Sequence, residues 1–169
     1  MLIGIHDSCL ENIELIKKPE YVLTIENLSS FNEYTQKIQD DGIVLYTGGF
    51  PTSTFQLFYK QLIEMAESQT YHWGDTDPHG FLILRTLQNI AGNAIVLPHL
   101  LDHPGGSAYS SSDKSALERI MPVNTIVDNL LLKLIDRGTG YIEQEEVEAI
   151  SPVCRHLTNN IQSSRQENS

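Results

Sequence analysis

Through residue 97, short apolar runs alternate with longer segments whose apolar residues recur every three or four positions. The short runs are rich in β-branched and aromatic residues, a composition typical of buried strands. Recurrence at three or four positions is typical of amphipathic helices. The predicted strands cover 21–25, 43–46, 70–73 and 94–97, and the predicted helices between them cover 29–39, 51–67 and 81–90.

This alternation of strand and helix predicts an α/β fold, with a mostly parallel sheet of about four strands flanked by helices and joined by right-handed crossovers. Ligands of such sheets bind at the carboxyl ends of the strands. After residue 100 the pattern is less regular, and we expect helices at 113–121 and 123–136. The expected organisation is a lead-in helix at 1–19, the α/β domain at 20–150, and a terminal helix with a disordered tail at 151–169.

The charge balance limits the partners that the chain can bind. Its 169 residues suffice for one domain with a proper core. Acidic residues number 22 against 11 Lys and Arg, which gives a formal net charge of −11. Because Lys and Arg drive most nucleic-acid binding, this balance argues against a DNA-binding protein that acts alone. A nucleic-acid substrate would require a basic surface from another domain or subunit.

Targeting and redox signals are few. No apolar run approaches the roughly 20 residues of a membrane-spanning helix, and the first ten residues lack the basic start of a signal peptide. The two cysteines, Cys9 and Cys154, are too few for a disulfide framework and lack zinc-ligand spacing. We therefore expect a cytoplasmic protein with reduced thiols and no membrane partner.

Two carboxylates follow the third predicted strand. Asp75 and Asp77 lie two positions apart, so in an extended segment their side chains point to the same side. Oxygen ligands that share a direction suit a hard cation such as Mg²⁺. Pro78 fits the first turn of the next helix, and Gly80 lets a backbone pass close by. The alternative is structural, because Asp also fills ordinary turns and helix caps.

A third carboxylate, Glu26, follows the first predicted strand. Three carboxylates at one sheet edge repel one another unless a cation neutralises them. Mg²⁺ held by few carboxylates keeps open positions for water and a phosphate, where it polarises the phosphoryl group. Glu26 would then be either a ligand or the base that takes a proton from water. The alternative is three unrelated surface acids.

Other candidates have ordinary explanations beside the functional ones. Gly48 and Gly49 follow the second predicted strand, where they could admit a phosphate close to the backbone or simply form a turn. His72 and His79 flank the Asp pair and could contact phosphate or serve as core or solvated residues. The sequence contains neither the P-loop nor the dinucleotide-binding glycine motif, so it offers no basis for a kinase-like or dinucleotide-binding role.

Four sequence blocks, taken together, resemble a known family. The Glu after strand one, the Gly after strand two and the Asp-x-Asp after strand three are similar to the Toprim domain of topoisomerases, primases and several nucleases. More closely, the blocks resemble the C-terminal domain of the Toprim nuclease subunit of Wadjet-type anti-plasmid systems, formerly a domain of unknown function. The blocks are Ile25-Glu26-Asn27, Tyr46 to Pro51, Tyr71 to Gly80, and Glu143-Gln144-Glu145.

The resemblance implies an enzyme, a metal-dependent DNA endonuclease that hydrolyses phosphodiesters as part of an anti-plasmid defence complex. The implied cofactor is Mg²⁺, for which Mn²⁺ can substitute, and the implied partners are DNA and condensin-like motor subunits. The implied catalytic residues are Glu26, Asp75 and Asp77. The implied metal ligands are these three residues together with Glu143 and Glu145. The implied substrate-binding residues are Gly48, Gly49 and His79.

Three questions stay open at the level of sequence. If the segment is extended, Glu143 and Glu145 share one face and could bind a second metal or its water, but acids also suit a solvated helix start. The chain is either an excised domain or a stand-alone member of the family. The alternative function is a non-catalytic Toprim-like assembly module, whose acidic crevice holds a structural metal or nothing.

Overall fold

The core of the fold is a parallel four-stranded sheet. The computed structural model describes residues 13–103 and 105–153. The strand order is β2-β1-β3-β4, and every neighbouring pair in this sheet is parallel. This confirms the predicted α/β class and is consistent with a Rossmann-like, Toprim-type fold. The strands are β1 (Tyr21–Ile25), β2 (Ile43–Tyr46), β3 (Gln69–Trp73) and β4 (Val96–Pro98).

Helices cover both faces of the sheet. Val22 of β1 packs into a cluster with Tyr59 and Leu62 of α2 and with Ile83 of α3, whereas Leu23 faces a second cluster that includes α1. Alternate residues of β1 therefore point to opposite faces, and all five are buried. The helices are α1 (Leu28–Lys37), α2 (Ser53–Ala66), α3 (Pro78–Ala91), α4 (Ser111–Ile120) and α5 (Thr125–Arg137).

Side-chain caps fix where the first three helices begin. Asn27, Thr52 and Asp77 each accept a hydrogen bond from a backbone N–H in the first turn of α1, α2 and α3. Ser29 and Ser30, where α1 was predicted to begin, lie inside the helix because Asn27 already binds both of their N–H groups. Pro78 stands in the first turn of α3, as predicted.

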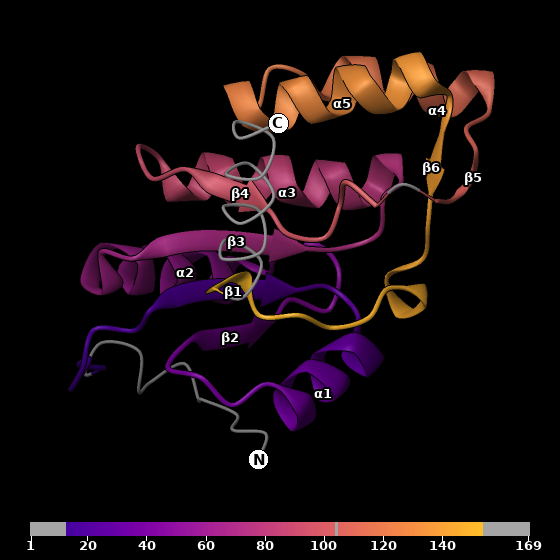
Figure 1. Cartoon of the computed structure of the whole chain (residues 1–169). Helices are drawn as coiled ribbons and strands as arrows, with labels where there is room; N and C mark the ends of the chain where they lie inside the picture. The colour runs from indigo at the N-terminus through magenta and orange to yellow at the C-terminus, as the bar shows by residue number, and fades with distance from the viewer. Residues whose placement is uncertain (1–12, 104, 154–169) are drawn as a thin grey trace, which may run out of the picture.

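The C-terminal third adds elements beyond the β4 edge and returns to the sheet (Figure 1). A two-stranded antiparallel sheet of β5 (Ser107–Ala108) and β6 (Thr139–Tyr141) was not predicted, because strands this short show no periodicity. After β6 the chain runs down to the carboxyl edge of the sheet, where a 3₁₀ turn, η2 (Gln144–Glu146), lies beside the start of α1 (Figure 1).

The described part of the predicted lead-in segment, residues 13–19, contains no helix. Lys17 instead forms a salt bridge with Asp41, and Leu15 packs against the α2–α3 cluster. Residues 1–12, and nearly all of the predicted terminal helix and tail, lie outside the described residues. In the described part of the chain, no helix is long and apolar enough to cross a membrane.

Candidate metal centre

The carboxyl ends of β1 and β3 form the candidate site. The strand order reverses between these two strands, since β1 is followed in the chain by β2 on one side and later by β3 on the other. Such a reversal opens a crevice at the carboxyl edge of a parallel sheet. Glu26 follows β1 and Asp75 follows β3, and the Glu26 N–H donates to the Trp73 carbonyl at 3.0 Å. The predicted convergence of strand ends is therefore present.

Three carboxylates converge beside this crevice. Ligand oxygens of Asp75, Glu143 and Glu145 all lie within 4.8 Å of one another. Asp75 is half-buried, whereas Glu143 and Glu145 are exposed. Among the described residues, no Lys or Arg forms a salt bridge with any of the three. Carboxylates this close repel one another without a cation, so the donor set fits a hard divalent ion such as Mg²⁺.

Glu143 and Glu145 do not reach Asp75 from an extended segment, the conformation that the sequence analysis considered for them. Glu143 is the extended residue before η2, and Glu145 lies within the turn. A turn rather than an alternating strand therefore brings the two side chains together. Tyr141 supports the arrangement, because its hydroxyl donates to Glu143 Oε1 at 3.2 Å.

Gln144, between these two acids, binds the ends of both central strands. Its buried side chain accepts from the Asn27 N–H at 2.8 Å and donates to the Trp73 carbonyl at 3.1 Å. Its own N–H donates to Asp75 Oδ1 at 2.7 Å. Gln144 therefore ties η2 to β1 and β3, and so places Glu143 and Glu145 beside Asp75. Sequence reasoning gave Gln144 no role of its own.

Thr76 provides a second attachment for the returning segment. It lies between the two aspartates and points the opposite way, into the protein, where it is 2% exposed. Its hydroxyl accepts from the Ile142 N–H at 2.7 Å and donates to the Gly140 carbonyl. Its backbone N–H donates to the Ile142 carbonyl at 3.1 Å. Side chains alternate in direction along this extended segment, so Thr76 points opposite to Asp75 and Asp77. It therefore faces the segment that leads to Glu143 and Glu145.

Asn27 has two roles that sequence reasoning missed. Its side-chain oxygen caps α1, and its side-chain nitrogen donates to Glu145 Oε1 at 2.5 Å. An Asn between a predicted strand and a predicted helix is a recognisable capping signal. The contact with Glu145, which is 118 residues away in the chain, leaves no such local signal.

Glu26 lies next to the three-carboxylate cluster rather than within it. Burial raises the pKa of Glu26 to about 7, helped by the negative charge of Asp75, against an opposing contribution from His79. Glu26 Oε1 lies 3.7 Å from His79 Nδ1, while Oε2 is buried without a hydrogen-bond partner among the described residues. A carboxyl with a pKa near neutrality can exchange a proton at physiological pH.

Asp75 is also hard to ionise. Burial raises the pKa of Asp75 to about 6, and the hydrogen bond from the Gln144 backbone acts in the opposite direction. The charges of Glu143, Asp77 and Glu145 raise it further. A cation between these groups would remove that repulsion.

Asp77 performs a structural task. Its Oδ1 accepts from the Gly80 N–H at 2.7 Å and so caps α3. Asp77 lies outside the cluster formed by Asp75, Glu143 and Glu145. The predicted close approach at Gly80 is present, since a β-carbon there would lie 2.2 Å from the Asp75 carbonyl oxygen. Asp77 therefore caps a helix, which is the structural alternative given for the Asp pair in the sequence analysis.

The loop after β2 borders the site through an aromatic contact. Gly48 and Gly49 both have positive φ, at 64° and 89°, so the loop uses backbone conformations that favour glycine. Phe50, which follows them, packs edge-on against His79 with ring centroids 4.8 Å apart. His79 is more than half exposed and lies beside Glu26. Phe50 therefore brings the loop that contains Gly48 and Gly49 against His79, which lies at the edge of the site.

An apolar groove of about 500 Å³ lies elsewhere, between β4 and α5. Its lining includes Leu97, Ile126 and Leu130 and none of the five acids discussed above. The candidate site is an open edge rather than this groove.

Comparison with known proteins identifies the family. The family described as "Wadjet protein JetD, C-terminal" matches residues 3–153. The chain belongs to this family. It is also similar to Wadjet protein JetD of Bacillus cereus (strain Q1), at 27% identity over 103 residues. The resemblance to a subunit of Wadjet-type systems, expected from the four sequence blocks, is thus confirmed.

The chain matches only part of that relative. The aligned residues cover 59% of this chain and 25% of the Bacillus cereus protein. The JetD family assignment therefore concerns a C-terminal domain, and it assigns no activity to the individual acids.

Proposed function

We propose that this chain is the Mg²⁺-dependent nuclease domain of an anti-plasmid defence complex and hydrolyses DNA phosphodiesters. One observation carries the proposal: Asp75, Glu143 and Glu145, from distant parts of the chain, bring ligand oxygens within 4.8 Å of one another at the β1–β3 crevice. Membership of the JetD C-terminal family adds support for a defence role.

In this proposal, Asp75, Glu143 and Glu145 would hold the ion. Bound Mg²⁺ would supply positive charge that polarises a phosphoryl oxygen and lowers the pKa of water. Gln144 and Asn27 orient the glutamates through the bonds described above. Asp77 starts α3 and adds negative charge nearby. Mn²⁺, with similar ligand preferences, can take the place of Mg²⁺.

Glu26 acts as the general base at Oε1. This oxygen points toward His79 and the open crevice, whereas Oε2 is buried. A proton taken from water at Oε1 would be held by a carboxyl whose pKa, near 7, suits that exchange. His79, Gly48 and Gly49 would border the DNA phosphates.

The partners follow from charge. A chain with a formal net charge of −11 offers DNA little electrostatic attraction, so a basic surface must come from elsewhere in the complex. We propose condensin-like motor subunits as those partners.

The test is cleavage of closed circular plasmid by the assembled complex, with Asp75→Asn and Glu143→Gln as separate variants. Each is expected to lower cleavage by at least about 10²-fold, the order of one electrostatic or acid–base contribution. Glu118→Gln, on the exposed surface of α4, makes the same charge change away from the site and should cleave normally. Wild-type protein that binds Mn²⁺ without cleaving DNA would instead support the non-catalytic assembly module.

A further inference from the structure

Four residues of β1 and β3 share one face of the sheet behind Glu26. Thr24 and His72 are paired in the register of these parallel strands. The next same-face positions, two residues on, are Glu26 and Gly74. All four therefore line the face that carries Val22, which α2 and α3 cover.

The His72 ring is buried and only half satisfied. The residue is 0% exposed. Its Nδ1 lies 2.9 Å from Thr24 Oγ1. Its Nε2 has no hydrogen-bond partner among the described residues. A buried ring nitrogen without a partner carries a desolvation cost that native proteins rarely tolerate.

The buried oxygen of Glu26 borders the same space. A β-carbon built on Gly74 would lie 2.6 Å from Glu26 Oε2 and 2.9 Å from His72 Nε2. The missing side chain of Gly74 therefore leaves room in which these two unpartnered polar atoms approach each other. A hydrogen bond between them requires a rotation of the Glu26 side chain toward His72 Nε2.

We propose that His72 is a positioning residue for Glu26, with a neutral ring that carries its proton on Nε2 and directs it at Glu26 Oε2. The Thr24 hydroxyl then donates to Nδ1, and both ring nitrogens are satisfied. With Oε2 fixed from behind, Oε1 faces the crevice. The inference deepens the proposed function. It rests on that proposal for the role of Glu26 as a base, whereas the contact between His72 and Glu26 is inferred independently of it.

The opposite tautomer would undo this arrangement. With its proton on Nδ1, the ring would donate to Thr24, whose hydroxyl would donate to the Tyr71 carbonyl, 3.2 Å away. When Glu26 is ionised, the lone pair on Nε2 would then face a carboxylate oxygen, and the two would repel. The position of this one proton therefore decides whether His72 holds the ionised form of Glu26, the form that acts as a base.

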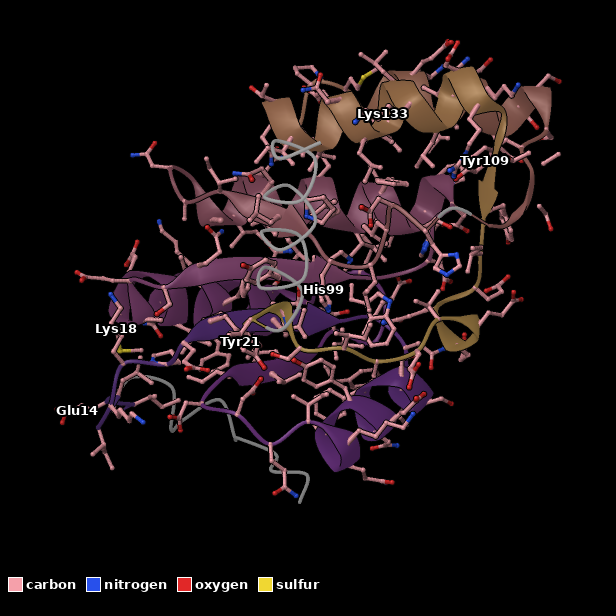
Figure 2. All side chains as sticks on the ribbon, in the orientation of Figure 1. Glu14, Lys18, Tyr21, His99, Tyr109 and Lys133 are labelled. Carbon is pink, nitrogen blue, oxygen red and sulfur yellow. The ribbon has the colours of Figure 1, made fainter. Side chains whose placement is uncertain are left out.

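Ring-nitrogen NMR of the metal-free chain labelled with ¹⁵N-histidine tests the contact directly. We expect the His72 proton on Nε2, and a shift of that signal in Glu26→Ala. His99 is a matched control on the opposite face, where it is buried edge-on to Trp73 and its Nε2 lies 2.8 Å from the Ile150 carbonyl. Figure 2 shows His99 in front of the sheet, whereas α2 lies behind it. A proton on Nδ1, or a His72 signal unchanged by Glu26→Ala, would overturn the inference.

Cleavage by the assembled complex tests the consequence. His72→Leu should lower kcat by about 10- to 100-fold, the range expected when a base is misplaced by about 1 Å, with Mn²⁺ affinity unchanged. His72→Gln, whose amide N–H₂ can replace Nε2–H, should recover most of the rate. Should His72→Leu fail to fold, Gly74→Ala is the substitute, because its β-carbon fills the space between Glu26 Oε2 and His72 Nε2.

Full activity in folded His72→Leu or Gly74→Ala would overturn the positioning role. The NMR measurement and the cleavage assay together distinguish a failure of this inference from a failure of the proposed function. A wild-type complex that cleaves no DNA would refute the nuclease proposal, and the NMR result would still decide whether His72 holds Glu26.

Discussion

At the residue scale, burial controls the candidate site by opposing ionisation. Glu26 and Asp75 both have pKa values raised mainly by burial, to about 7 and about 6. Both groups must be ionised to serve a cation or to accept a proton. The metal-free protein therefore carries an electrostatic cost at neutral pH that a cation would relieve.

The metal-free protein should lose stability as pH rises through this window. A carboxyl with a raised folded-state pKa stabilises the fold fully below its unfolded value of about 4, and this contribution is lost as pH rises through the folded value. Thermal melts without divalent ions, from about pH 5 to 8, should show Tm falling from pH 5 to about pH 7 and levelling off above it.

The variant Glu26→Gln should flatten this dependence, because it removes the group with the higher pKa. Glu118→Gln, on exposed α4, should retain the wild-type slope. If wild type and Glu26→Gln show identical slopes, the Glu26 carboxyl does not titrate in this range.

At the element scale, one short turn connects segments that the sequence separates. The 3₁₀ turn η2 lies against the ends of β1 and β3, and the Gln144 side chain binds a backbone group of each. Two backbone groups, one buried and one partly buried, thus depend on a side chain more than 70 residues away. This dependence makes Gln144 the sharpest test of how the site is assembled.

Gln144→Ala should destabilise the protein by about 2 kcal/mol or more, because each buried group left unpaired costs roughly 1–3 kcal/mol. Mn²⁺ affinity should fall as well, since Glu143 and Glu145 lose their placement. Chemical denaturation and calorimetric metal titration measure the two effects. Gln61→Ala, at an exposed position of α2, is the control and should change neither. A variant with wild-type stability would show that η2 is held by other contacts.

Two substitutions at Asp77, which caps α3, distinguish a capping role from a metal-binding role. Asp77→Asn keeps a capping oxygen and should leave stability unchanged or raised in metal-free buffer, whereas Asp77→Ala should cost about 1 kcal/mol. Because Asp77 lies outside the cluster, Asp77→Asn should weaken Mn²⁺ binding much less than Asp75→Asn does. Equal losses of affinity in the two variants would make Asp77 a metal ligand.

At the scale of the whole molecule, the sequence predicted the central sheet well because its strands are short, continuous apolar runs. The strands β1 and β2 have the predicted bounds, and Glu26 and Asp75 meet because parallel strands share a carboxyl edge. The elements that depend on distant contacts were missed. These include β5 and β6, the bonds of Gln144, and the link from Asn27 to Glu145.

The Asp-x-Asp pattern illustrates the limit of local reasoning. Spacing predicts that Asp75 and Asp77 share a direction, but it does not show that Asp77 caps α3 while Asp75 meets Glu143 and Glu145. The partner that distinguishes the two aspartates comes from the far end of the chain. Only the folded arrangement therefore separates a helix cap from a candidate ligand.

The central claim is that Asp75, Glu143 and Glu145 form one divalent-cation site at the β1–β3 edge. Anomalous diffraction from crystals soaked in Mn²⁺ tests it most directly. A peak at coordination distance, about 2.0–2.2 Å from the carboxylate oxygens of Asp75, Glu143 and Glu145, is the predicted result. A Mn²⁺ peak elsewhere, or none at saturating Mn²⁺, would contradict the claim.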